Sequence, residues 1–125
     1  MPHLAALRLL TPVLGISLEP MLGPVDISRW IGKGRRYLDW VIIGGESGPN
    51  ARPCSQGWIT DVIAQCTEER VPVFVKQLGA NSNGLQTANP DPVRWAFNHP
   101  KGGDPEEWPF YLRRRQFPET VRRTL

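Results

Sequence analysis

The stretch LDWVIIGGESGP, residues 38–49, decides the fold. Its first half is almost continuously apolar and rich in β-branched residues, and its second half is a glycine-rich turn. Apolar runs of this kind are typical of strands that are buried on both faces, as in parallel sheets. We therefore expect a buried parallel strand that ends at the turn.

Two further apolar runs flank this strand along the chain. Val13–Leu18 precedes it and stops at Glu19, and Val73–Val75 follows it and runs into Lys76. Between the runs we expect two helices. One is predicted by the helical spacing of apolar residues over 58–66, with Ser55 as its candidate cap, and must end before Pro72. The other is a weaker helix over 25–31, with Asp26 as cap.

The predicted order is strand–helix–strand–helix–strand, a right-handed parallel unit. The polar residues at the strand ends, Glu19, Glu46 and Lys76, are 27 and 30 residues apart, close to one β–α repeat each. The fold class is therefore α/β, a partial (β/α) barrel with about three parallel strands and an irregular basic C-terminal segment. Residues 1–79 form the half-barrel core, and residues 80–125 are a turn-rich loop and basic aromatic tail of the same domain. We expect the chain to be too short for a complete barrel.

Composition limits the function classes. The 125 residues are 40% hydrophobic and 22% charged, which is ordinary for a globular domain. No apolar run approaches the roughly 20 residues of a membrane span, and Met1–Leu10 lacks a signal-peptide pattern, so we expect a cytoplasmic protein without membrane contact. Cys54 and Cys66 have no further ligands at metal spacing, so neither a metal site nor a cofactor is predicted.

Three charged residues at the strand ends are the candidate catalytic group. In parallel α/β folds, ligands bind at the carboxyl ends of the strands, where Glu19, Glu46 and Lys76 would stand. Two carboxylates and an ammonium there can do acid–base chemistry or hold a charged ligand. The alternative is a Glu–Lys pair that merely closes the sheet edge.

The glycine-rich turn and the arginine that follows it are a candidate anion site. The backbone N–H groups of Gly44, Gly45, Ser47 and Gly48 can hold an anion, and Arg52 can assist. The alternatives are a tight turn that needs glycine and a solvated loop arginine.

The tail combines guanidinium groups with aromatic rings. Arg113, Arg114 and Arg115 lie near Trp108 and Phe117, a mixture that suits phosphate contact and base stacking on nucleic acid, or contact with a partner. In the alternative, which we favour, the aromatic residues pack back on the sheet.

Several blocks of the chain, in order, resemble one family, the phage-associated family named after phage gene products thirty-seven and sixty-eight, for which no activity is established. These blocks are SLEPMLGPVD (17–26), LDWVIIGGESGPNARP (38–53), VPVFVKQLG (71–79), KGGD (101–104), EWP (107–109) and the stretch 112–118. The resemblance implies that full-length members are about twice as long and begin with clustered cysteines, similar to the iron–sulfur motif of radical S-adenosylmethionine enzymes.

By this resemblance the chain is similar to the carboxyl half of a full or partial (β/α) barrel. It lacks the three thiolates that hold an iron–sulfur centre. The Gly44-Gly45-Glu46 tripeptide resembles the one with which radical enzymes hold a methionine amino group, but it lies late in the barrel, so that role is not carried over. The family pattern usually has another residue, often Met, at the position of Cys54, which argues against a thiol function there.

Three hypotheses follow for the function. In the first, a phage- or prophage-type half barrel, catalytically incomplete alone, completes a site with an amino-terminal half-barrel partner. In the second, a small phage protein binds or inhibits host nucleic-acid machinery through its tail. In the third, the chain is a nonfunctional truncation. An open three-stranded sheet exposes two edges and an apolar face, so we also expect self-association or a partner that covers Trp40, Ile42 or Phe74.

Overall fold

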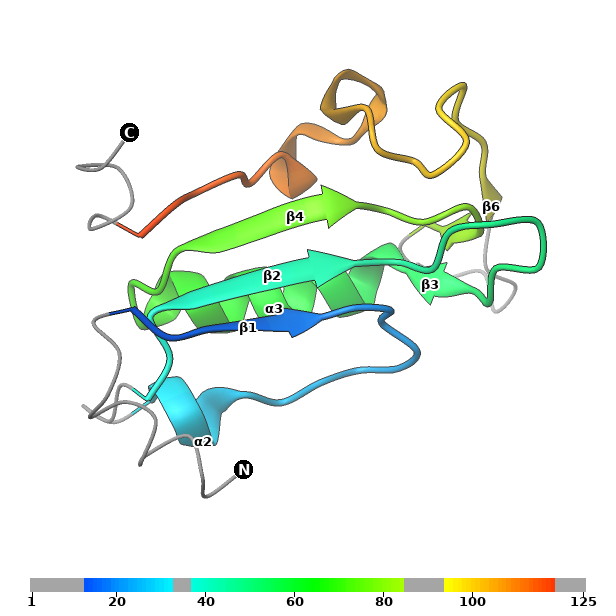
Figure 1. Ribbon diagram of the computed structural model, residues 1–125. Coiled ribbons are helices and arrows are strands. Elements are labelled where there is room, and N and C mark those ends of the chain that lie inside the picture. Colours follow the sequence, from blue (N-terminus) through cyan, green and yellow to red (C-terminus); the bar gives the residue numbers. More distant parts are fainter. Residues whose placement is uncertain (1–12, 33–36, 85–93, 119–125) are drawn as a thin grey trace.

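The centre of the fold is a three-stranded parallel sheet in the order β1-β2-β4 (Figure 1). The computed structural model describes residues 13–32, 37–84 and 94–118. Its strands are β1 (Gly15–Leu18), β2 (Trp40–Gly44) and β4 (Val73–Gln77), and both neighbouring pairs are parallel. The three predicted strands and their parallel direction are therefore confirmed. Closure of the sheet into a barrel is not part of this structure.

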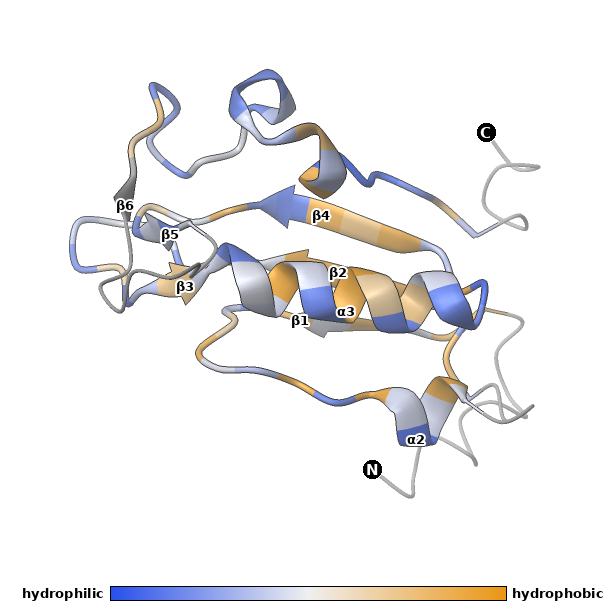
Figure 2. Ribbon diagram, turned by 180° about the vertical axis from the view of Figure 1, so that it is seen from behind, coloured by the Kyte–Doolittle hydropathy of each residue, from blue (hydrophilic) through white to orange (hydrophobic). Residues whose placement is uncertain are grey.

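Helix α3 (Gln56–Glu68) covers one face of this sheet (Figure 2). The Ser55 hydroxyl caps it by accepting a hydrogen bond from the Gly57 N–H at 3.1 Å, as the sequence predicts. The helix ends before Pro72, also as predicted. Its buried side chains are Gln56, Ile59, Val62, Ile63 and Cys66.

The core lies between α3 and the sheet. Val41 and Ile43 of β2, and Val73 and Val75 of β4, are buried there. Every second residue of these strands points to this side because side chains alternate along a strand. Cys66 joins the core from α3 as a free thiol, and burial raises its pKa to about 12. This confirms the prediction of a buried, reduced cysteine.

Helix α2 (Ser28–Ile31) is shorter than the helix predicted over 25–31. Its N-cap residue is Ile27, and Asp26 instead accepts hydrogen bonds from the backbone N–H and hydroxyl of Ser28, which lower its pKa. The Gln65 side chain of α3 explains the shortening. Its amide accepts from the Ile27 N–H and donates to the Val25 carbonyl, each at 2.8 Å, and so occupies the carbonyl that a helix starting at residue 25 would use first.

A second, small sheet lies beside the first. It consists of β3 (Cys54–Ser55), β5 (Ser82–Asn83) and β6 (Arg94–Trp95), in that order. The prediction of a loop from residue 80 onward was therefore incomplete, because β5 and β6 lie within it. Strands of two residues are too short to produce a periodic pattern in the sequence. None of the helices in the described ranges is long and apolar enough to cross a membrane.

The C-terminal segment closes one edge of the main sheet. After two short 3₁₀ helices, η1 (Pro105–Glu107) and η2 (Phe110–Leu112), residues 114–116 run beside β4, with an antiparallel bridge between Phe74 and Arg115 (Figure 1). The N–H of Val75 donates to the carbonyl of Arg114 at 2.7 Å, and that of Gln116 to Val73 at 3.0 Å. The expectation of two exposed edges was therefore wrong, because this segment pairs with β4. The order of the sheet leaves β1 as its other edge.

The fold predicts that Gly45 cannot carry a side chain. A Cβ atom there would lie 2.4 Å from the Leu78 carbonyl oxygen and 2.9 Å from the Gly79 Cα, both main-chain atoms that cannot rotate away. We expect Gly45→Ala to lower the free energy of unfolding by about 1–3 kcal/mol in chemical denaturation, as overpacking does. Gly23→Ala is the matched control, because a Cβ there meets nothing within 4 Å. Equal stability of the two variants would contradict this packing.

Candidate functional site

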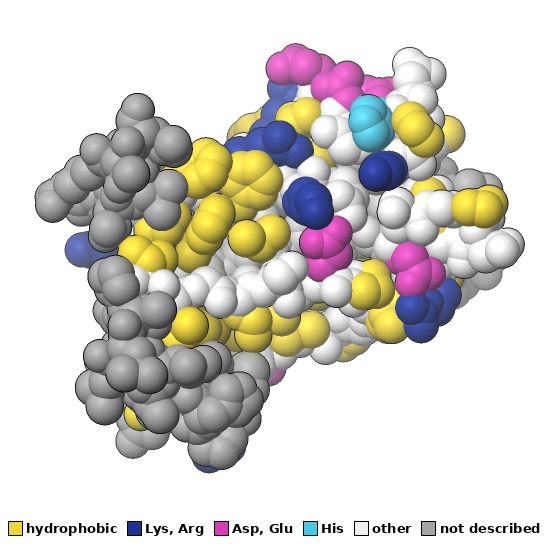
Figure 3. Space-filling view, in the orientation of Figure 1, with side chains coloured by type: hydrophobic (Ala, Val, Ile, Leu, Met, Phe, Trp, Pro, Cys, Tyr) yellow, Lys and Arg dark blue, Asp and Glu magenta, His cyan; other side chains and the backbone are white. Residues whose placement is uncertain are grey.

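The face of the sheet opposite α3, called the open face here, carries the candidate site. Aromatic side chains gather on it: the ring centroids of Trp40 and Phe74 are 6.4 Å apart, and the Phe117 ring lies 5.6 Å from the first and 5.4 Å from the second. These rings are only half-buried. Figure 3 shows this face, with a group of hydrophobic side chains next to charged ones. The open face therefore combines an apolar floor with a charged rim.

The rim is formed where β1 and β4 end. The Lys76 ammonium lies 3.6 Å from Oε1 of Glu19, and Gln77 Nε2 donates to the same oxygen at 2.8 Å. The prediction placed Glu19, Glu46 and Lys76 within reach of one another on one rim, and the structure bears it out for Glu19 and Lys76. Their side chains are 26% and 58% exposed, so both charges remain accessible to a ligand.

Gln77 is a rim residue that the sequence analysis missed. Burial alternates along β4 to its end, so Lys76 is exposed and Gln77 is buried like Val73 and Val75. The pairing of β2 with β4 shifts register between Ile43 and Gly44, so that Gly44 pairs with Gln77. From this position the Gln77 amide bridges Glu19 and the Gly45 carbonyl, each at 2.8 Å. Its place at a strand end was visible in the sequence, but these two contacts were not.

A hollow of about 290 Å³ lies where the apolar floor meets the rim. Its lining comes from all three strands and the tail: Ser17, Glu19, Trp40, Ile42, Phe74, Lys76 and Phe117. An ion pair at the end of an aromatic-lined hollow can fix the orientation of a small polar molecule.

Glu46, the third candidate catalytic residue, has a different partner. Its carboxylate accepts hydrogen bonds from the backbone N–H and the Nε of Arg52, at 3.1 and 3.2 Å. These bonds lower the pKa of Glu46 and raise that of Arg52. The structure thus brings together two of the three predicted residues, Glu19 and Lys76, and pairs the third with an arginine.

In the glycine-rich turn, the first two glycines lie where the backbone is closely packed, which explains why these positions are glycine. Gly44 and Gly45 are buried, and the Gly45 N–H donates to the Gln77 carbonyl at 3.2 Å. Ser47 and Gly48 are exposed. Because Arg52 already holds the Glu46 carboxylate, an external anion would have to compete with an internal one. Anion binding at this turn stays a prediction.

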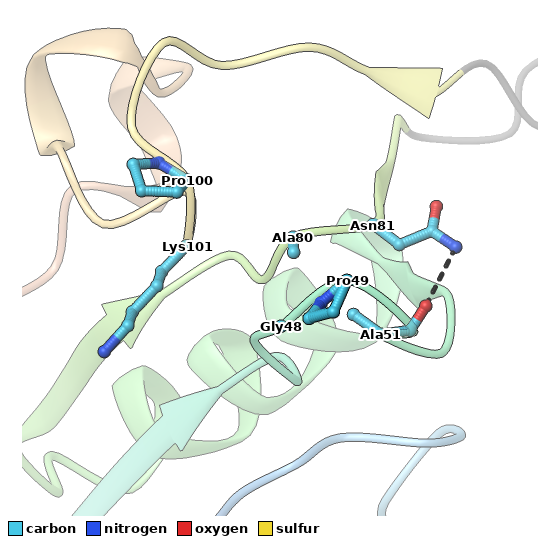
Figure 4. A pocket seen from close by; sticks show the side chains of 7 residues that line it. All are labelled: Gly48, Pro49, Ala51, Ala80, Asn81, Pro100 and Lys101. Atoms are coloured by element: carbon cyan, nitrogen blue, oxygen red, sulfur yellow. Dashed lines mark hydrogen bonds between the residues drawn. The ribbon is translucent and has the colours of Figure 1, made fainter.

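A second hollow, of about 570 Å³, lies beyond the ends of β2 and β4 (Figure 4). It is lined mostly by small side chains: Gly48, Pro49, Ala51, Ala80, Asn81, Pro100 and Lys101. Asn81 Nδ2 donates to the Ala51 carbonyl at 3.3 Å, and the Lys101 ammonium points away from these residues in Figure 4. This hollow therefore lacks the converging charges of the first.

Two of the three tail arginines bind the protein's own main chain. Arg115 donates to the carbonyls of Val75 and Lys76 at 3.1 and 2.8 Å, and its guanidinium lies 5.3 Å from the centroid of Trp108. Arg113 donates to the Trp108 carbonyl at 3.1 Å. Trp108 is itself buried. The favoured alternative expected solvated arginines and aromatic residues packed on the sheet; Phe117 packs in this way, but Arg113 and Arg115 bind main-chain carbonyls. Nucleic-acid contact through the tail stays a prediction.

The fold and the rim together define a parallel α/β domain with one helix-covered face and one open face that ends in an ion pair. Over residues 3–111 the sequence matches the family described as protein of unknown function, DUF5131, and the chain belongs to that family. No curated protein and no solved structure is significantly similar to it.

The contacts of Arg115 predict a structural role for this side chain. We expect Arg115→Gln to lower the free energy of unfolding by about 1–2 kcal/mol, because two charged hydrogen bonds to β4 are lost. Arg114→Gln is the matched control, since the contact of Arg114 with β4 is made by its carbonyl oxygen. Thermal melts and a nucleic-acid titration over a range of salt concentrations separate the two roles. An unchanged melt with a shallower salt dependence for Arg115→Gln would contradict the packing role.

Proposed function

We propose that this chain is the carboxyl-terminal half of a phage- or prophage-type partial (β/α) barrel, similar to those of radical S-adenosylmethionine enzymes. In such barrels, helices cover the outside of the sheet and ligands bind at the carboxyl ends of the strands. The observation that carries the proposal is the ion pair of Glu19 and Lys76, which lies at these ends and on the face that α3 leaves open.

Helix α3 covers one face of the sheet and leaves the other open, which supports the proposal of a partner that covers the open face. An apolar floor with Trp40, Ile42 and Phe74 is costly to leave in water. The segment 114–116 already pairs with β4, so further strands would join the sheet at β1. An amino-terminal half barrel would add its strands there and cover the floor. Self-association would cover the same floor without adding new chemistry.

We further propose that the chain is catalytically incomplete alone. Its two cysteines are buried, and desolvation raises the pKa of Cys54 to about 11 and that of Cys66 to about 12. Thiols that resist ionisation are poor ligands for an iron–sulfur centre, because the thiolate is the ligand form. The cluster cysteines of the proposed enzyme would therefore come from the other half.

The alternative, a small phage protein that acts on host nucleic-acid machinery through its tail, has less support. Arg113 and Arg115 would have to leave main-chain carbonyls to which they donate hydrogen bonds. We therefore keep it as the second hypothesis.

Co-purification tests the half-barrel proposal. The chain is co-expressed with a tagged amino-terminal half from a longer member of the family, and we expect it to be retained with the tag. Ile42→Asp places a charge on the apolar floor and should reduce retention at least about tenfold, because the charge would be buried unpaired.

Phe110→Asp is the matched control, because Phe110 is 82% exposed on η2 and does not line the hollow. It should leave retention unchanged. Ser17→Arg, on the exposed part of β1, serves as a second disruptive variant if Ile42→Asp fails to fold. Absence of retention with the unaltered chain, or equal retention for Ile42→Asp and Phe110→Asp, would overturn the proposal.

A further inference from the structure

We propose that the hollow on the open face binds a small zwitterion with an apolar body, of the class of free apolar α-amino acids. The inference rests on the proposed function in one respect, namely that ligands bind on the open face. Three properties of the hollow lead to it: an ion pair with loose geometry, a carboxylate oxygen whose hydrogen bond is long, and an apolar floor of suitable size.

The carboxylate of Glu19 has room for one more donor. Its Oε1 accepts the hydrogen bond from Gln77 at 2.8 Å and lies near the Lys76 ammonium. Among the residues that the structure describes, its Oε2 accepts a hydrogen bond from the Ser17 hydroxyl alone, at a long 3.5 Å. A ligand ammonium at Oε2 would make a stronger, charge-assisted bond while Gln77 keeps the carboxylate in place.

The ammonium of Lys76 is also available. Its distance of 3.6 Å from Glu19 exceeds the roughly 2.7–2.9 Å of a close charge-assisted bond. The side chain is 58% exposed, so its ammonium is accessible to a ligand carboxylate. A ligand with a single charge would pair with one member of the ion pair and leave the other without its partner. A zwitterion pairs with both charges at once, which favours this class, although water can also solvate the partly exposed Lys76 and Glu19 side chains.

The floor supplies the apolar contact. Trp40, Phe74 and Phe117 form one cluster of rings, and Ile42 lies beside them in the lining. The hollow measures about 290 Å³, just below the roughly 300–1,000 Å³ of sites for drug-sized molecules, so it suits one smaller, amino-acid-sized molecule. The larger hollow of Figure 4 lacks an ion pair and carries no comparable inference.

Titration of the isolated chain tests the ligand class. The probe is L-phenylalanine, and the readouts are calorimetry and the NMR signal of the Trp40 indole N–H, which donates to the Gln116 carbonyl beside the hollow. Three analogues each remove one feature: N-acetyl-L-phenylalanine removes the ammonium, L-phenylalaninamide removes the carboxylate, and glycine removes the apolar body. We expect saturable binding of L-phenylalanine and a loss of roughly tenfold or more for each analogue, as expected for losing one charged contact or the apolar contact.

Two variants assign the charges. Glu19→Gln should weaken L-phenylalanine binding roughly tenfold and affect binding of N-acetyl-L-phenylalanine much less. Lys76→Met should also weaken L-phenylalanine binding roughly tenfold, and should affect binding of L-phenylalaninamide much less. Lys101→Met is the matched control and should change nothing, because Lys101 does not line this hollow. Absence of saturable binding would overturn the inference. Equal binding of all four probes, or equal effects of Lys76→Met and Lys101→Met, would also overturn it.

These outcomes are independent of the co-purification result. The titration needs no partner, so its failure removes the ligand class and leaves the half-barrel proposal standing. Failure of co-purification with successful titration would remove the partner and retain the site.

Discussion

The packing of α3 against a single face of the β1-β2-β4 sheet is the interaction on which the rest of the structure depends. It places Val41, Ile43, Val73 and Val75 in a dry core, where the hydrophobic effect supplies most of the stability. Because side chains alternate along a strand, the same packing directs their neighbours onto the opposite face. The open face with its aromatic floor is therefore a direct consequence of how the core is built.

The C-terminal segment makes the two edges of the sheet different, because it pairs with the β4 edge and not with the β1 edge. By pairing residues 114–116 with β4, it satisfies main-chain groups that would otherwise remain at an edge, and it places Phe117 on the open face. The same segment anchors Arg115 between the rings of Phe74 and Trp108. In the proposed half barrel, further strands would therefore join the sheet at β1, next to Glu19. A partner that extends the sheet would meet the candidate site.

The sequence predicted the features that depend on local pattern. Continuous β-branched runs predicted the parallel strands, and the Ser55 cap and Pro72 bounded α3 at both ends. The spacing of strand ends also placed Glu19 near Lys76. Each of these signals arises within a few residues, so one sequence was enough to detect it.

The features that it did not predict depend on contacts between distant segments. Gln77 donates to Glu19, which lies 58 residues earlier in the chain. Glu46 is the exception, because it pairs with the nearby Arg52 rather than with the rim. The two-residue strands β5 and β6, and the pairing of 114–116 with β4, have no periodic signal of their own. Tertiary hydrogen bonds decide these features, and a single sequence contains no record of them.

Amide hydrogen exchange of the isolated chain tests the central claim, that the tail segment seals the β4 edge of the sheet. The N–H groups of Val75 and Gln116 each donate across this edge, and that of Val41 donates within the core to the Pro72 carbonyl. The account predicts that Val75 and Gln116 exchange within about tenfold of Val41, because all three open only with the sheet. Exchange of Val75 and Gln116 orders of magnitude faster than Val41 would contradict it.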